Sequence, residues 1–129
     1  MRPVRIALVV LAVSCRRTPP PWLEEMKGRM QTELDAVNPT DGIDKVEATN
    51  IASHYLSEYI AGCGGVDEPK KEGDRWSFGV RIGYAGSPSD WVIKVDSRTG
   101  AVWADGNKWF PDFPTFKTSI LADFVHRRM

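Results

Sequence analysis

Two cysteines and two histidines are the residues of this chain best suited to nucleophilic or metal chemistry. Cys63 and His54 are the one pair that suggests a thiol nucleophile beside a base, and one predicted helix carries both. Nine steps of about 100° place two side chains on opposite sides of a helix, so we expect no catalytic dyad. His126 is expected to be a surface residue of a terminal helix. The sequence has neither Cys-x-x-Cys nor His-x-x-x-His and predicts no metal site.

Acidic residues and glycines offer two further kinds of site. Because the chain has seventeen acidic residues, its sequence does not exclude a pair of carboxylates for acid and base catalysis. Four aspartates fall at expected loops or strand ends and are interpreted as solvated turn residues: Asp90, Asp96, Asp105 and Asp112. The glycines at 62, 64 and 65 lack the preceding strand of a dinucleotide-binding loop, so we expect them to end a helix. The sequence thus indicates no catalytic residue and no cofactor.

The other cysteine, Cys15, follows a segment typical of a bacterial lipoprotein signal. Two arginines precede an unbroken apolar run over residues 6–13. This run covers about 12 Å as a helix, too short to span a hydrocarbon core of about 30 Å. Residues 11–15, LAVSC, resemble a lipobox, in which the cysteine thiol receives diacylglycerol. We predict a signal peptide over 1–15, lipidation of Cys15 and a membrane-anchored location on the periplasmic side of the bacterial envelope. A Sec signal cleaved nearby is the alternative.

Composition limits the remainder of the chain to a single globular domain. Apolar residues make up 42% and charged residues 26% of the 129 residues, which are globular values. Seventeen basic residues balance seventeen acidic ones, so a cationic surface for nucleic acid is not expected. Three consecutive prolines indicate a stiff tether over residues 16–21, and we expect the domain over 22–129.

Two helices are expected first in the domain. Apolar residues recur at three- and four-residue steps over 22–37. The second helix begins at a capping box formed by Asp44 and Glu47, and its apolar stripe continues to Cys63. On this spacing His54 and Glu58 fall on the exposed side of the helix.

Alternation with a period of two replaces the helical spacing from Asp74 onward. Residues 76–84 alternate, and Trp76, Phe78 and Tyr84 are expected on the buried face. A second strand begins at Trp91, a hairpin loop occupies 96–100, and 101–105 returns as a strand. Helical spacing resumes after residue 114. The expected fold is α+β: two N-terminal helices, the second packed on an antiparallel three- or four-stranded sheet, and a short C-terminal helix.

Aromatic residues concentrate in the second half of the chain. Nine of the thirteen Phe, Trp and Tyr residues lie between positions 76 and 116. Exposed tryptophans are strong anchors for protein partners, although core packing is the more common role for any single ring. We predict a partner-binding patch that contains Trp103, Trp109, Phe110 and Phe113.

The stretch from about Ile43 to Gly106 resembles two bacterial families. The shared features are the helix after residue 46, GDRW at 73–76, and WVIKVDSRTGAV at 91–102, which contains V-D-x-x-T-G-x-V. One family is the immunity proteins of polymorphic toxin systems with a nuclear-transport-factor-like, or cystatin-like, fold. The other is the PepSY domain, which is associated with peptidase inhibition or protein binding. The segment GYAGSP at 83–88 favours the immunity proteins.

Both resemblances imply a non-enzymatic protein that binds another protein. We expect a lipid-anchored envelope domain that neutralises a toxin by binding it. One alternative is a PepSY-type domain that inhibits a peptidase or senses a ligand. Another is a small isomerase- or dehydratase-like enzyme on a cone-shaped fold, which needs a deep pocket with a buried carboxylate or histidine of shifted pKa. The expected partner is a toxin or peptidase, with membrane attachment through the lipid anchor only and no nucleic acid.

Overall fold

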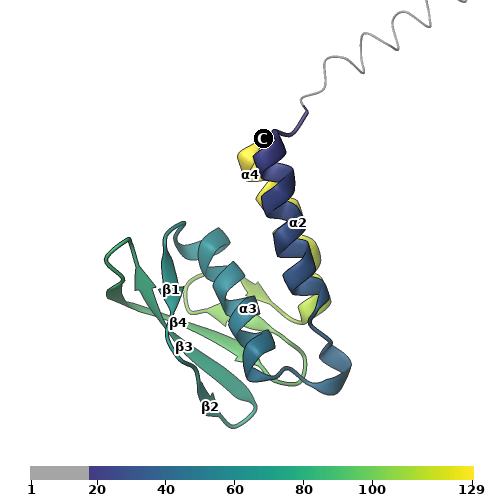
Figure 1. Ribbon diagram of the computed structural model, residues 1–129. Coiled ribbons are helices and arrows are strands. Elements are labelled where there is room, and N and C mark those ends of the chain that lie inside the picture. The colour runs from purple at the N-terminus through teal and green to yellow at the C-terminus, as the bar shows by residue number, and fades with distance from the viewer. Residues whose placement is uncertain (1–17) are drawn as a thin grey trace, which may run out of the picture.

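A computed structural model describes residues 18–129 of the chain. The predicted signal peptide, the lipidation site Cys15 and the first part of the predicted tether lie outside the described residues. The fold is α+β, as expected, and none of its described helices is long and apolar enough to cross a membrane (Figure 1). The elements in chain order are α2 (Pro21–Asp35), η1 (Pro39–Asp41), α3 (Lys45–Tyr55), η2 (Leu56–Ile60), β1 (Gly64–Val66), β2 (Lys70–Glu72), β3 (Arg75–Ile82), β4 (Ser87–Asp96), β5 (Val102–Ala104), β6 (Trp109–Phe110) and α4 (Phe113–Arg128).

Helices α2 and α4 form an antiparallel pair beside the rest of the domain (Figure 1). Proline occupies the first position of α2, where its missing N–H costs no intrahelical hydrogen bond. Leu23, Met30 and Leu34 recur at helical spacing and are buried against α4. The predicted C-terminal helix has 16 residues, so it is as long as the other helices rather than short.

The capping box at the start of α3 is confirmed. The backbone N–H of Glu47 donates to Asp44 Oδ1 at 2.8 Å, and the N–H of Asp44 donates to Glu47 Oε1 at 3.1 Å. The regular α-helix ends at Tyr55, and one π-helical turn, η2, follows it. The predicted continuation of the helix to Cys63 is wrong, because η2 closes with the bond from Ala61 N–H to the Leu56 carbonyl and the chain becomes extended there.

The sheet contains six antiparallel strands, which is more than the three or four expected. The order is β1-β3-β4-β5-β6, and β2 pairs with β3 beyond the end of β1. The glycines expected only to end a helix therefore open an edge strand. Gly64 has φ +147°, and a Cβ at this position would lie 2.2 Å from the Arg81 carbonyl oxygen, so glycine permits the close pairing of β1 with β3.

Strand β3 has a break in its register and ends before Tyr84. The pairing of β3 with β4 shifts between Gly79 and Arg81, and β3 ends at Ile82. Tyr84 then lies in the turn to β4 and is fully exposed, so the prediction that it is buried is wrong. Trp76 is partly buried, and its indole Nε1 donates to the Ile43 carbonyl at 3.0 Å.

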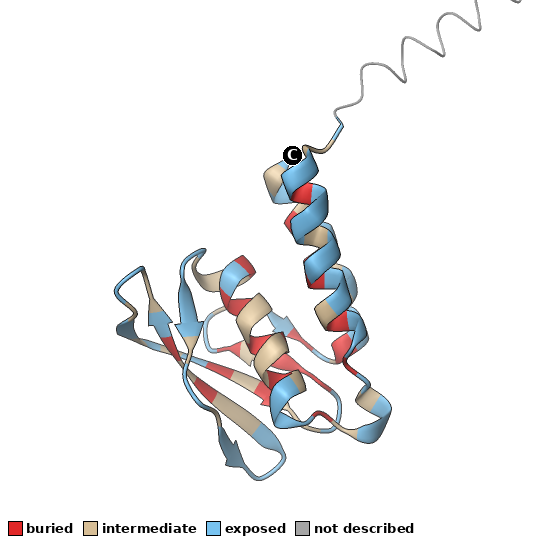
Figure 2. Ribbon diagram, viewed as in Figure 1, coloured by how far each residue is buried: buried red, intermediate tan, exposed pale blue. Residues whose placement is uncertain are grey.

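One face of the sheet packs on α3 and forms the hydrophobic core (Figure 2). Phe78, Ile93, Val95 and Val102 on this face are fully buried beneath the apolar stripe of α3. The opposite face carries no helix in the part of the chain that the structure describes (Figure 1). We call it the outer face, and it leaves side chains of β3, β4, β5 and β6 accessible.

Candidate functional site: the outer face and the charged π-turn

The predicted aromatic patch divides between surface and core. Trp103 and Trp109 are direct partners across β5 and β6, so their rings share the outer face. Trp109 is 61% exposed and Trp103 is half-buried. Phe110 and Phe113 are buried, because one alternates to the inner face of β6 and the other begins the packed side of α4. The predicted patch is therefore wrong in these two residues, which cannot present their rings to a partner.

A continuous row of side chains crosses the outer face. Strand pairing aligns one residue from each of five strands in this row: Lys70, Ser77, Lys94, Trp103 and Trp109. Because directly opposed residues point to the same face, two ammonium groups and two indoles lie along one line. We call this set the outer row.

Two lysines of the outer row carry positive charge without an ion-paired carboxylate. Lys70 and Lys94 form no ion pair with any residue from 18 to 129. The adjacent Arg75 forms none either, although Glu72 and Asp96 lie directly opposite it across the strands. The Arg75 guanidinium lies over the Trp103 ring, 5.5 Å from its centroid, which is a cation–π contact. The neighbouring cations Arg81 and Arg98 differ, because each is paired, with Asp67 and Asp74 respectively. The row is thus a basic and aromatic strip on a chain of zero formal charge.

The hairpin loop after β4 has the predicted geometry and fixes the start of α4. Asp96 Oδ1 accepts from the N–H groups of Arg98 and Thr99 at 2.8 and 2.9 Å. Partial burial acts to raise the pKa of Asp96, but the hydrogen bonds from Thr99 and Arg98 outweigh it and lower the pKa below the usual aspartate range. Gly100 has φ +72°, and Phe113 packs against it. The loop therefore acts as a structural support, as the turn interpretation of Asp96 expected.

The other predicted aspartates lie in two different settings. Asp112 caps α4, with its Oδ1 accepting from the Thr115 N–H at 2.8 Å. Asp90 and Asp105 are both exposed and line one open hollow beside Trp91. Exposure keeps both carboxylates solvated. Asp105 lies in a turn as expected, whereas Asp90 lies within strand β4, so the prediction of a turn residue at Asp90 is wrong.

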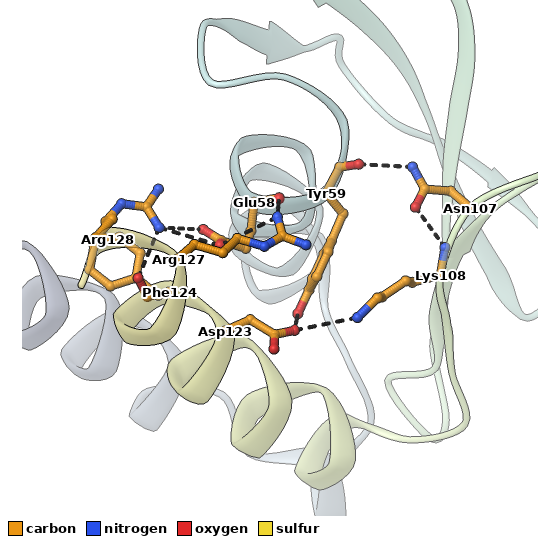
Figure 3. A network of polar contacts seen from close by, with 8 residues as sticks. All are labelled: Glu58, Tyr59, Asn107, Lys108, Asp123, Phe124, Arg127 and Arg128. Atoms are coloured by element: carbon orange, nitrogen blue, oxygen red, sulfur yellow. Dashed lines mark hydrogen bonds and ion pairs between the residues drawn. The ribbon is translucent and has the colours of Figure 1, made fainter.

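The π-turn η2 carries a buried charge that the sequence placed on the surface. The side chain of Glu58 is 1% exposed, so its prediction as a solvent-facing residue is wrong. The wider π-turn shifts the angular positions of the residues after Tyr55 and turns Glu58 toward α4. Two arginines from the last turn of α4 meet it there (Figure 3).

Glu58 is held by Arg127 and Arg128 together (Figure 3). Arg128 Nη1 donates to Glu58 Oε2 at 3.0 Å and to Oε1 at 3.3 Å. Arg127 Nη1 donates to the Glu58 carbonyl and lies 3.6 Å from Oε1. A buried carboxylate needs such compensation, because its desolvation is costly without paired charges. These contacts fasten the end of α4 to the π-turn.

Tyr59 extends this network toward β6 (Figure 3). Its hydroxyl donates to Asp123 Oδ2 at 2.7 Å, and its carbonyl accepts from Asn107 Nδ2 at 2.9 Å. Lys108 Nζ lies 3.6 Å from the same Asp123 oxygen. Burial and the hydrogen bond to Asp123 raise the pKa of Tyr59 well above its usual range. The hydrogen bond from Tyr59, assisted by the Lys108 charge, lowers the pKa of Asp123.

A pocket of about 240 Å³ opens between α2, η2 and α4. Its lining combines apolar residues with ionisable ones: Met26, Met30, Phe124, Arg29, His54, Glu58 and Arg128. His54 is only 17% exposed at its side chain and its Nε2 lies 2.6 Å from Glu33 Oε2, so the prediction that it faces solvent is also wrong. The ionisable groups of this pocket are thus engaged with partners from the protein itself.

Cys63 and His54 lie in separate hollows. Cys63 is exposed and lines an open hollow with Tyr84, whereas His54 lines the pocket between the helices. The expected absence of a dyad was argued from one continuous helix, but the chain leaves the helix before Cys63. His126 is exposed near the end of α4, as expected. Residues 18–129 contain no cluster of three metal-ligating side chains.

Comparison with protein families, with curated proteins and with solved structures finds no match. The fold brings together two groups of side chains in the described residues, the outer row and the π-turn network.

Sequence reasoning identified two of the five residues of the outer row and missed the buried network. Trp103 and Trp109 were found because indoles stand out in composition. Lys94 could have been found from alternation, since it falls between Ile93 and Val95 on the polar side of β4. Glu58 gave no local signal, because its partners lie 69 and 70 residues later in the chain.

Proposed function

We propose that this protein is a non-enzymatic, lipid-anchored envelope protein whose domain binds another protein through the outer face of its sheet. The proposed role is that of an immunity protein, which neutralises a toxin by occupying its surface. Binding through a preformed sheet needs no moving part and no bound cofactor. The proposed partner is another protein, as expected from the sequence. Of the predicted patch, only Trp103 and Trp109 are proposed to contact it.

The observation that carries the proposal is the outer row. Trp109 exposes 61% of its surface beside Trp103 on a face without a covering helix. A large indole left in water is unfavourable for a domain that acts alone, whereas Trp and Arg are the residues most enriched at binding hot spots. The cation–π contact from Arg75 holds the Trp103 ring in place, which lowers the entropy lost on binding.

The charge of the outer row specifies the partner's chemistry. Lys70 and Lys94 have no carboxylate partner among residues 18–129, whereas Arg75 lies opposite Glu72 and Asp96 across the strands. A partner with an acidic surface and an apolar centre would pair with these cations and cover the two indoles. We therefore expect an acidic face on the toxin.

Two other functions make different demands on the structure. A PepSY-type domain would use the same face to inhibit a peptidase, so it differs only in the partner. An isomerase- or dehydratase-like enzyme would use the pocket between α2, η2 and α4, where Glu58 is the buried carboxylate. Both carboxylate oxygens of Glu58 accept from Arg128, and this pairing supports a structural role for Glu58 over a catalytic one.

The test is calorimetry with the purified product of the neighbouring gene. We expect Trp109→Ala to weaken binding by about 2 kcal/mol, or about thirtyfold in Kd, as for a hot-spot tryptophan. Tyr84→Ala is the matched control, because Tyr84 is an even more exposed aromatic residue in a turn outside the outer row. Its variant should bind as the wild type does.

Three outcomes would decide between the functions. Equal affinities of the wild type and Trp109→Ala would refute the outer row as the binding site. Inhibition of a peptidase through Trp109 would select the PepSY-type function. Turnover of a small molecule that Glu58→Gln abolishes and Trp109→Ala spares would establish an enzyme instead.

A further inference from the structure

The free end of the α2/α4 pair carries exposed apolar side chains that neither the core nor the outer row explains. Trp22 is 53% exposed, Met26 46% and Met129 41%. Seven large apolar residues are exposed in residues 18–129, and these three come from the start of α2 and the end of α4. We call this end of the helix pair the tip.

The tip is also the end of the domain from which the chain leads toward residues 1–17. Only Thr18, Pro19 and Pro20 separate those residues from α2 (Figure 1). The C-terminus lies beside the first turn of α2, so both ends of the described chain meet there (Figure 1). An anchor at residue 15 would hold Trp22 within seven residues of the lipid, which is about 22 Å even for a fully extended polyproline segment.

The residues of the tip match the chemistry of a membrane interface. Tryptophan favours the level of the lipid headgroups, where its ring is partly apolar and its N–H remains hydrated. Lys27 follows Met26 directly in α2, and a long basic side chain can reach a phosphate group while its stem stays in apolar surroundings. Arg29 lies further along the helix, where it is paired with Glu25 at 3.7 Å. Glu24, the acidic residue of the first turn of α2, falls about 160° away from Met26 around the helix, so it faces away from this surface.

We propose that the tip contacts the phospholipid surface directly, with Trp22 at the depth of the headgroups. This inference rests on the proposed envelope location and goes beyond attachment through a lipid anchor alone. The Trp22 indole, the Met26 thioether and the Lys27 ammonium group supply a second contact, which fixes the orientation of the domain. The two acyl chains of the predicted diacylglycerol would already hold the chain at the bilayer, so the role of the tip contact is to orient the domain.

This orientation leaves the outer row free for a protein partner. Helix α4 has 16 residues, so it separates the tip from β6 by about 24 Å. Trp109 precedes the opposite end of α4 and lies away from the lipid. The two exposed tryptophans thus serve two different surfaces.

Fluorescence quenching by brominated lipids tests the contact on the full chain. The protein is isolated from membranes with detergent and reconstituted into vesicles of phosphatidylethanolamine and phosphatidylglycerol, with and without brominated acyl chains. We compare the wild type with Trp22→Phe and with Trp109→Phe, which removes an indole of similar exposure. Phenylalanine keeps an aromatic ring at each position, so loss of signal reports the position of the indole.

Brominated lipid is expected to quench part of the emission of the wild type and of Trp109→Phe. Trp22→Phe should lose that quenched part. Equal quenching in all three proteins, or its loss in Trp109→Phe, would overturn the proposal. The solubilised chain could instead sediment as a dimer that the Trp22→Ala change dissociates. This result would also overturn the proposal, because it would show that the tip binds a second copy of the chain. The mass of the isolated chain reports the modification of Cys15 separately, so failure of the anchor and failure of the tip contact are distinguishable.

Discussion

Replacing Glu58 by glutamine tests whether the buried charge holds α4 on the π-turn. The change keeps the size of the side chain but removes the anion that Arg127 and Arg128 share. Loss of one partner of a buried pair costs about 3–5 kcal/mol when the other charge stays buried. The arginine side chains are 48% and 29% exposed, so water can partly solvate them, and we expect a loss of about 2 kcal/mol. For a domain of this size the melting temperature would fall by roughly 10 °C.

Urea and thermal unfolding of Glu58→Gln measure this loss. Glu72→Gln is the control, because Glu72 is exposed on β2, and its stability should change by less than about 0.5 kcal/mol. A double-mutant cycle with Arg128→Ala should give a coupling energy of at least about 1 kcal/mol. If Glu58→Gln unfolds like the wild type, the account of the network is refuted.

Two further predictions concern the tyrosines and a pair of glycines. Burial raises the pKa of Tyr55 from 10.0 to about 12, and it raises the pKa of Tyr59 as well. The folded state therefore holds these two protons more tightly than the unfolded state does. The protein should lose stability as the pH rises from 10 toward 12. Absorbance of tyrosinate should show these two residues ionising only as the protein unfolds; ionisation of all three tyrosines near pH 10 in a folded protein would contradict this. Gly100→Ala should destabilise the protein by about 2–4 kcal/mol in urea, since φ is +72° and the new Cβ would lie 2.6 Å from Phe113 Cβ. Gly28→Ala, with open space around the Cβ in a helix interior, should stabilise it by about 0.5–1 kcal/mol, and equal effects of the two changes would contradict the geometry.

Elements governed by local chemistry could be predicted from the sequence. The capping box of Asp44 and Glu47 starts α3 as expected, because both of its bonds join residues three apart. The loop after β4 closes as expected for the same reason, with Asp96 bonding amides two and three residues later. Strand β3 and the part of β4 from Trp91 onward follow from alternation of apolar and polar residues. Strand β4 begins at Ser87, four residues before its predicted start.

Elements governed by distant contacts could not be predicted. The π-turn lies where Glu58 contacts arginines about 70 residues later in the chain. The apolar spacing of the sequence continues past this turn to Cys63, so it predicted an uninterrupted helix. Strands β1 and β2 are three residues long, which is too short for alternation to appear. Tyr84 was misplaced because the alternation of apolar and polar residues continues to Tyr84, whereas β3 ends at Ile82 and a turn follows it.

The candidate site depends both on residue types, which the sequence shows, and on strand pairing, which it does not show. Composition identified Trp103 and Trp109, but only the pairing of β5 with β6 shows that they share one face. The same aromatic stretch supplies Phe110 and Phe113 to the core, because each of them points to the packed side of its element. Lys70 joins the row through β2, which the sequence did not predict.

The most direct test of partner binding through the outer face uses the indole N–H signals of the five tryptophans in a nitrogen-15 correlation spectrum. Titration with the toxin or peptidase partner is expected to shift or broaden the signals of Trp103 and Trp109. The signal of Trp76, whose indole donates to the Ile43 carbonyl beneath the sheet, should stay in place. Saturating partner that leaves Trp103 and Trp109 unchanged, while it shifts the residues around the Glu58 pocket, would contradict the account.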